Sequence, residues 1–350
     1  MTRRYTRITR FAILIFTLLT ASLACSVAAF EDILSTRGQA GVTIRALAID
    51  PAVPTTLYAG TYFGVFKSTD GGGSWSRANT GLPAAEVHAL AIDPLTPATL
   101  YAGTDGGSVF KSTDSGASWE AASTGLMTNF VHALAIDPVK PTTLYAGTSP
   151  VESGPVYKSM DGGETWSLAS IGLAHDVVHA LAIDPETPTT LYAGAGSGVF
   201  KSTDGGGNWT RVLIGAGVGV PGLAIDPKVP TTLCMGGLGG PMYKSLNGGR
   251  TWMAGKTNQY VYALAINPET PSIIYAGTIS GVLKSTDGGA NWSAINTGLP
   301  DGDVFALVID PLTPTTLYAG TQDKGVFKST DAGENWSAAN TGLTASLPAP

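Results

Sequence analysis

Seven copies of one eight-residue pattern, each ending in tryptophan, constrain the fold of this chain more than any other feature. The first copy reads STDGGGSW over residues 68–75, and all seven Trp of the chain close one copy each. The acidic position can accept N–H bonds within a tight turn, and the glycines that follow permit positive φ. We expect the Trp to be a structural apolar anchor. The acidic or amide position and the Trp of the seven copies are Asp70 and Trp75, Asp114 and Trp119, Asp161 and Trp166, Asp204 and Trp209, Asn247 and Trp252, Asp287 and Trp292, and Asp331 and Trp336.

Each pattern closes a longer unit of roughly 43 residues. The fullest unit has short β-branched and apolar segments at 87–94, 99–103 and 109–111, separated by Gly, Pro and Asp. These segments and the residues after the Trp predict four short strands, named A to D in chain order. Seven four-stranded sheets bury their faces when they pack radially. The sequence therefore predicts an all-β fold, a seven-bladed β-propeller of four-stranded antiparallel blades, with one eight-residue pattern per blade, over residues 44–343.

The eight-residue pattern resembles the Asp-box, also called the BNR repeat, of sialidase-like β-propellers. The resemblance covers about residues 44–340 and implies that the box is a structural element at the blade periphery. The wider repeat, with LYAGT before GVFKSTDGG, resembles uncharacterised bacterial BNR/sialidase-like repeat proteins. It is also similar to the photosystem II stability and assembly factor family, which are non-enzymatic binding propellers. That family's basic Arg cluster is not found here, so its particular partner does not carry over.

The first 29 residues differ from the repeats. Four Arg within the first ten residues precede an apolar run at 11–24 and small residues at 28–29. This pattern predicts a secretory signal peptide at 1–29, and hence a secreted, periplasmic or cell-surface protein. A lipoprotein leader with Cys25 as the lipidated residue is the alternative. Residues 30–43 are interpreted as an N-terminal extension and 344–350 as a C-terminal tail.

Composition narrows the classes of partner. Charged residues make up 13% of the chain and the formal net charge is −6. Nothing basic accumulates after the leader, so a nucleic-acid groove is not expected. No later apolar run is long enough to span a membrane. We expect a monomer without a cofactor, and Cys234 to be a buried apolar residue.

The spacings within the repeats predict two different faces. The A–B and C–D connections have constant length in all seven units, whereas the B–C and D–A loops vary. Alternate turns of an antiparallel sheet lie at opposite ends, so the constant turns should share one face and the variable loops the other. Variable loops on a rigid scaffold are the usual place for binding.

One position at the start of strand A differs between the units and should rim the central channel on the variable face. The residues at this position are Arg45, His88, His132, His179, Pro221, Tyr262 and Phe305. Three interpretations stay open: a His copied by duplication without function, a ligand-contacting ring, and a metal-binding His cluster. We take Arg45, His88, His132, His179, Tyr262 and Phe305 as candidate ligand-binding residues and expect no metal. Carboxylates in nearby loops, such as Glu86 and Asp105, are interpreted as solubilising.

The resemblance to the Asp-box raises sialidase activity as an alternative. Sialidase chemistry needs three Arg, a Tyr nucleophile with a Glu partner, and an acid Asp. The few Arg beyond the leader lie mostly beside boxes, and the Tyr are mainly strand-B repeats. We therefore assign no catalytic residue. The interpretation is a secreted, non-catalytic binding or scaffold propeller for an unknown protein or carbohydrate partner. The alternative is a carbohydrate-active glycoside hydrolase with a carboxylate-based site.

Overall fold

The computed structural model describes residues 41–345, apart from 129, 150–154, 174–175, 215–218, 238 and 258. The chain divides into residues 1–41 and 42–350, and everything below concerns the second unit. The predicted signal peptide at 1–29 and the alternative leader at Cys25 lie outside the described residues. So do most of the predicted extension and tail. Among the described residues, no helix is long and apolar enough to cross a membrane.

The described strands form seven sheets of four, one for each repeat. Blades 1 to 4 comprise β1 (Ile44–Ile49), β2 (Leu57–Thr61), β3 (Gly64–Ser68) and β4 (Ser76–Arg77); β5 (Val87–Ile92), β6 (Leu100–Thr104), β7 (Ser108–Ser112) and β8 (Glu120–Ala121); β9 (Val131–Ile136), β10 (Leu144–Thr148), β11 (Val156–Ser159) and β12 (Ser167–Leu168); and β13 (Val178–Ile183), β14 (Leu191–Ala195), β15 (Gly198–Ser202) and β16 (Thr210–Ile214). Blades 5 to 7 comprise β17 (Gly222–Ile225), β18 (Leu233–Gly236), β19 (Tyr243–Ser245) and β20 (Met253–Ala254); β21 (Val261–Ile266), β22 (Ile274–Thr278), β23 (Gly281–Ser285) and β24 (Ser293–Ala294); and β25 (Val304–Ile309), β26 (Leu317–Thr321), β27 (Gly325–Ser329) and β28 (Ser337–Ala338).

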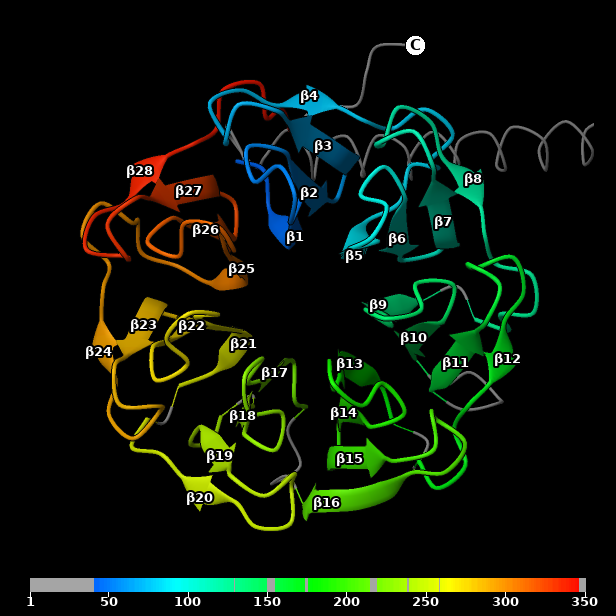
Figure 1. Cartoon of the computed structure of the whole chain (residues 1–350). Coiled ribbons are helices and arrows are strands. Elements are labelled where there is room, and N and C mark those ends of the chain that lie inside the picture. The colour runs from blue at the N-terminus through cyan, green and yellow to red at the C-terminus, as the bar shows by residue number, and fades with distance from the viewer. Residues whose placement is uncertain are drawn as a thin grey trace, which may run out of the picture. The chain divides into compact units, whose positions relative to one another are not determined.

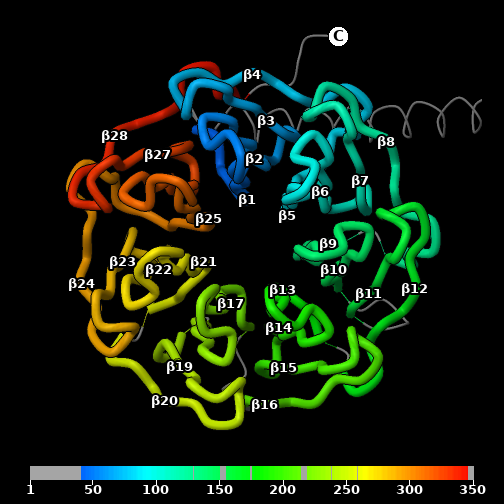
Figure 2. The backbone as a smooth tube through the Cα atoms, in the orientation of Figure 1, coloured from blue at the N-terminus to red at the C-terminus, as the bar shows by residue number. Residues whose placement is uncertain are grey.

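Every sheet is antiparallel and keeps the chain order A, B, C, D from one edge to the other. Figures 1 and 2 show the blades in a closed ring, with strand A innermost and strand D outermost. Neighbouring A strands contact each other around the ring, including β25 with β1. The predicted seven-bladed all-β propeller is confirmed, and each blade is complete within one repeat.

The ring closes without a shared blade. Blade 7 packs directly on blade 1, where Tyr318 Oη donates a hydrogen bond to the Gly71 carbonyl at 3.1 Å. The Trp75 backbone N–H donates to the Thr341 carbonyl at 2.7 Å. Closure therefore uses the same kind of contact that joins other neighbouring blades.

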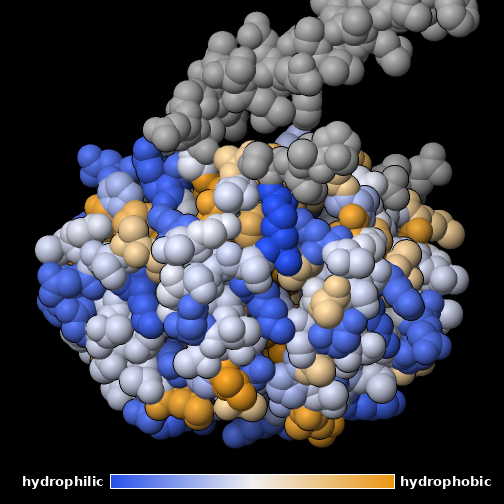
Figure 3. All heavy atoms as spheres, turned by 90° about the horizontal axis from the view of Figure 1, so that it is seen from above, coloured by the Kyte–Doolittle hydropathy of each residue, from blue (hydrophilic) through white to orange (hydrophobic). Residues whose placement is uncertain are grey.

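The hydrophobic core lies between adjacent blades. One buried cluster joins Tyr58, Val65 and Ala78 of blade 1 to Leu100 and Trp119 of blade 2, and similar clusters recur around the ring. The strand-B residues Leu-Tyr-Ala-Gly-Thr are buried throughout because both faces of each sheet are covered. On the rim seen in Figure 3, apolar side chains are instead scattered among polar ones.

Close packing of the blades also explains the invariant glycine in strand B. In blade 2 a Cβ on Gly103 would lie 2.6 Å from Val131 Cγ1 of blade 3. Val131 is fully buried. The glycine therefore lets strand A of the next blade approach, which sets the distance between the innermost strands.

Candidate functional site

The box forms a hydrogen-bonded turn, as its sequence predicts. In blade 1, Asp70 Oδ1 accepts from the Ser74 backbone N–H at 2.8 Å, and Oδ2 accepts from Ser74 Oγ at 2.6 Å. Ser68 Oγ also donates to Asp70 Oδ1 at 2.8 Å. These bonds, those from Ser74 above all, lower the pKa of Asp70 to about 2. In blade 5, Asn247 makes the corresponding turn, accepting from the Thr251 N–H at 2.9 Å.

The box also joins neighbouring blades, which the sequence analysis did not predict. Tyr101 Oη and Lys111 Nζ of blade 2 both donate to the Gly162 carbonyl in the box of blade 3, at 2.9 and 2.8 Å. In return, Trp166 Nε1 of blade 3 donates to the Ala122 carbonyl of blade 2 at 2.7 Å. A Lys lies within strand C of every repeat, directly before the box, and this recurring residue was the available signal. The box is thus an inter-blade latch as well as a turn.

The Trp anchors are not all alike. Five are buried, and their Nε1 atoms reach a carbonyl of the preceding blade. Trp252 and Trp292 are only partly buried, and they donate to Gly249 and Gly289 within their own boxes. The latch between blades 4 and 5 and the latch between blades 5 and 6 therefore lack the hydrogen bond from Trp to the preceding blade, and both should be weaker.

The two faces expected from the spacings are present. On one, the box face, the box contacts the A–B turn of its own blade, as where the Gly71 N–H donates to the Thr55 carbonyl at 2.8 Å. On the other, the loop face, the B–C loop contacts the segment entering strand A. There the Asp105 N–H donates to the Glu86 carbonyl at 2.9 Å.

The candidate binding residues come together on the innermost strands near the loop face. We call Arg45, His88, His132, His179, Tyr262 and Phe305 the axial ring. Its first half is aromatic and cationic: Tyr262 and Phe305 pack edge to face at 4.8 Å between centroids. The Arg45 guanidinium carbon lies 4.5 Å from the Phe305 centroid. Burial and the nearby Asp303 carboxylate raise the pKa of Tyr262, whose Oη donates to Asp303 Oδ2 at 3.2 Å.

The second half of the axial ring consists of three imidazoles in a row, packed edge to face or tilted against one another. The ring centroids of His88 and His132 are 5.5 Å apart, and those of His132 and His179 are 5.7 Å apart. Burial lowers the pKa of all three imidazoles. For His132, repulsion from both neighbouring imidazoles lowers the pKa further, to about 4. His132 Nε2 is within hydrogen-bond distance of Ser149 Oγ, at 2.8 Å. The surroundings of the three imidazoles therefore favour their neutral form.

An acidic residue from the loop face connects the two halves. Arg45 Nε donates to Glu86 Oε1 at 2.6 Å, and Glu86 Oε2 lies 3.6 Å from His88 Nε2. Asp303, the partner of Tyr262, occupies in blade 7 the position that Glu86 occupies in blade 2, two residues before the axial ring residue. From the sequence alone we interpret such carboxylates as solubilising. Their common position in the repeat is the signal that points to a shared role instead. Only Pro221 interrupts the succession of polar and aromatic side chains.

Three exposed aromatic residues lie in the loops around this ring. Tyr62 is in the B–C loop of blade 1, and Phe130 and Tyr260 are in D–A loops. Each exposes more than two fifths of its surface. Exposed aromatic side chains are typical of interaction surfaces.

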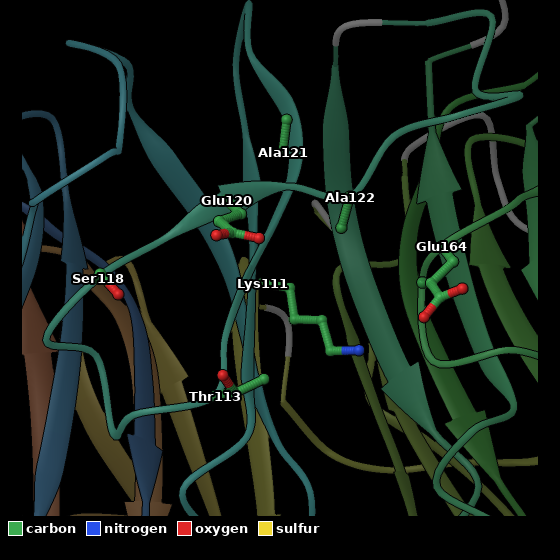
Figure 4. A pocket seen from close by; sticks show the side chains of 8 residues that line it. Lys111, Thr113, Ser118, Glu120, Ala121, Ala122 and Glu164 are labelled. Carbon is green, nitrogen blue, oxygen red and sulfur yellow. The ribbon is translucent and has the colours of Figure 1, made fainter.

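A surface hollow of about 240 Å³ lies elsewhere, between the boxes of blades 2 and 3 (Figure 4). Its lining includes Lys111, Glu120 and Glu164. The Lys111 amine is already bonded to the Gly162 carbonyl. We assign this hollow to the inter-blade latch and not to a binding site.

Comparisons with known proteins agree with the fold. The family model of sortilin, neurotensin receptor 3, matches residues 64–168. None of the curated proteins matches the chain. A GH74 xyloglucanase from Xanthomonas campestris is similar in structure with a TM-score of 0.72 at 17% identity, over 87% of this chain and 55% of that one. This chain thus spans about half the length of that enzyme.

Two further solved structures share the fold. The extracellular domain of BT4673 from B. thetaiotaomicron has a TM-score of 0.66 at 16% identity, over 83% of this chain and 38% of that one. YCF48 bound to D1 peptide has a TM-score of 0.64 at 16% identity, over 83% of this chain and 93% of that one. At these identities the likeness concerns the fold.

Proposed function

We propose that this chain is a secreted, non-catalytic binding or scaffold propeller that recognises a protein or carbohydrate partner on its loop face. The observation that carries the proposal is the axial ring: an Arg, three His, a Tyr and a Phe at equivalent positions of a repeated scaffold, arranged as two groups of contacting side chains that Glu86 connects. Repeats that served only to build the ring would not need such variety at its innermost strands. Varied side chains on a rigid framework are typical of recognition.

The chemistry of the loop face suits a neutral or mixed partner. Arg45 stacked on Phe305 and the exposed Tyr62, Phe130 and Tyr260 offer aromatic surfaces for sugar rings or apolar peptide side chains. Glu86 adds a hydrogen-bond acceptor beside them. The net charge of −6 disfavours polyanions as partners.

The predicted signal peptide supports a partner outside the cytoplasm. The leader at 1–29 is typical of a secretory signal, with lipidation at Cys25 as the alternative. Among the structural neighbours, the BT4673 domain is extracellular. YCF48, whose length this chain nearly matches, binds a peptide. Both are consistent with a secreted or surface-held recognition module, which we propose to act as a monomer.

A glycoside hydrolase is the second candidate, favoured by the likeness to the GH74 xyloglucanase. Such chemistry generally uses two carboxyl groups flanking the scissile bond. On the loop face, Glu86 and Asp105 both lie near His88, but Arg45 already holds one oxygen of Glu86. One oxygen of Glu86 is thus engaged in an ion pair and is not free to act on a substrate, which is why we place binding first.

The experiment that separates the two candidates is a screen of the purified chain on a glycan array and a displayed random-peptide library, with xyloglucan oligosaccharides assayed for cleavage. We expect saturable binding to at least one class of probe without turnover. Release of new reducing ends that is lost in Glu86→Gln or Asp105→Asn would replace the proposal by a hydrolase. Absence of any binding on either panel would contradict both.

A further inference from the structure

We infer that Glu86, His88 and Asp105 form a binding site for a divalent transition-metal ion of the Zn²⁺ class. One ligand atom from each residue lies within 4.8 Å of the others. His88 Nε2 is 3.6 Å from Glu86 Oε2 and 3.9 Å from Asp105 Oδ2. The inference departs from our expectation of no metal, and it does not depend on the proposed partner binding.

The state of His88 Nε2 is the first reason. This atom is buried and has no hydrogen-bond partner. Buried polar atoms are nearly always paired, so an orphan calls for an explanation such as an ion or water. An imidazole nitrogen with two carboxylates close to it is a metal-ligand arrangement.

The distances are the second reason. Ligands about 2.0–2.2 Å from a tetrahedral Zn²⁺ lie about 3.4 Å from each other. The separations from His88 Nε2 exceed that value by only a few tenths of an ångström. Asp105 is in the short B–C loop with 42% of its side chain exposed, so it can rotate inward. Three protein ligands leave a fourth position for water or for a group from a partner.

The surroundings are the third reason. Arg45 binds Glu86 Oε1 and so fixes this carboxylate with Oε2 near His88, which is the role of an outer-shell partner. Two carboxylates outnumber the single guanidinium, so the local field favours a cation. His132 Nε2 is engaged with Ser149, and we do not count it as a ligand.

The test is isothermal titration of Zn²⁺ into the untagged, EDTA-stripped chain, with the absorption spectrum of the Co²⁺ form as a second readout. We expect one strong site per chain. His88→Gln and Asp105→Asn should each weaken Zn²⁺ binding at least about 10-fold, the lower end of what even an outer-shell loss costs. His179→Gln is the matched control, because His179 holds the same position two blades away and has no pair of carboxylates beside it among the described residues, and it should leave the Zn²⁺ affinity unchanged.

Circular dichroism and melting curves should be recorded to check that each variant is folded. If His88→Gln is unstable, Asp105→Asn still tests the site, because Asp105 is partly exposed and its replacement should not disturb the fold. Unchanged Zn²⁺ affinity in Asp105→Asn, or loss of affinity in His179→Gln equal to that in His88→Gln, would overturn the site. So would a chain that binds no Zn²⁺ at micromolar concentrations. Failure here leaves the glycan and peptide screen unaffected, because that screen is run in EDTA.

Discussion

The box face and the loop face are built from the same seven repeats, yet they use their polar side chains differently. On the box face, Asp70 and its counterparts bond within their own turn, and Tyr and Lys of one blade share a carbonyl of the next. On the loop face, five residue types fill the seven equivalent positions at the start of strand A, and His88 Nε2 has no hydrogen-bond partner. Equivalent positions therefore repeat where they hold the ring together and diverge where the ring meets its surroundings.

The difference teaches where function can change without loss of the fold. A box substitution disturbs two blades at once, because the latch crosses between them. A substitution in the axial ring disturbs side-chain contacts near the surface and leaves the buried strand B untouched. Substitutions on the two faces should therefore affect stability to different extents.

Trp166→Ala should destabilise the chain by about 3–5 kcal/mol, because the indole is buried between blades and its Nε1 bonds to the Ala122 carbonyl. Denaturant unfolding measures the change. Trp252→Ala is the control within the same chain: this Trp is only partly buried and bonds inside its own box, so its loss should cost less. An equal loss of unfolding free energy in the two variants would show that neither the deeper burial of Trp166 nor its hydrogen bond to the preceding blade adds stability.

Asp161→Ala should cost roughly 1–2 kcal/mol, because three hydrogen bonds to the carboxylate are lost at an exposed turn. Asp161→Asn should cost less, since Asn247 makes the same turn naturally in blade 5. Thermal unfolding ranks the two variants. An Asn variant as unstable as the Ala variant would refute the role of the accepted N–H bond.

Tyr101→Phe should cost about 1 kcal/mol, because it removes the hydroxyl that donates to the Gly162 carbonyl while Lys111 remains bonded there. Tyr62→Phe on the loop face is the matched control. Tyr62 is exposed, so the change should stay within about 0.5 kcal/mol. Melting curves compare the two. A larger loss of stability in Tyr62→Phe than in Tyr101→Phe would contradict the view that the box face holds the ring together and the loop face does not.

The smallest effect concerns pH. Hydrogen bonds, chiefly from Thr165, lower the pKa of Asp161 in the folded chain from 3.8 to about 2. The stability from this carboxylate is therefore present above about pH 4 and is lost as pH falls towards 2. The difference in melting temperature between wild type and Asp161→Asn should shrink over that interval. A constant difference from pH 7 to pH 2 would contradict the hydrogen-bonded carboxylate.

Much of the fold could be predicted from the sequence because the repeats report the same unit seven times. The four strands, the turn at Asp70 and the burial of Cys234 and the strand-B Tyr follow from periodicity and turn chemistry within one unit. The latch did not, since Tyr101 and Gly162 belong to different repeats and meet only when blades pack.

The candidate site was predictable only in part for the same reason. The axial ring positions follow from one register in strand A, and the structure places Arg45 on Phe305 and His88 on His132 as neighbours. The carboxylates Glu86 and Asp105 come from two different loops. Their convergence on one imidazole depends on loop conformation, which the spacing of residues does not specify.

The most direct test of the division between the faces compares two triple variants for binding to the tightest probe from the glycan and peptide panels. One replaces His88, His132 and His179 by Ala; the other replaces Asp70, Asp114 and Asp204 by Asn. At a temperature where both are folded, we expect the His variant to lose at least about tenfold in affinity, equivalent to about 1.4 kcal/mol. The Asp variant should keep its affinity and melt at a lower temperature. Loss of affinity in the Asp variant but not in the His variant would contradict the account.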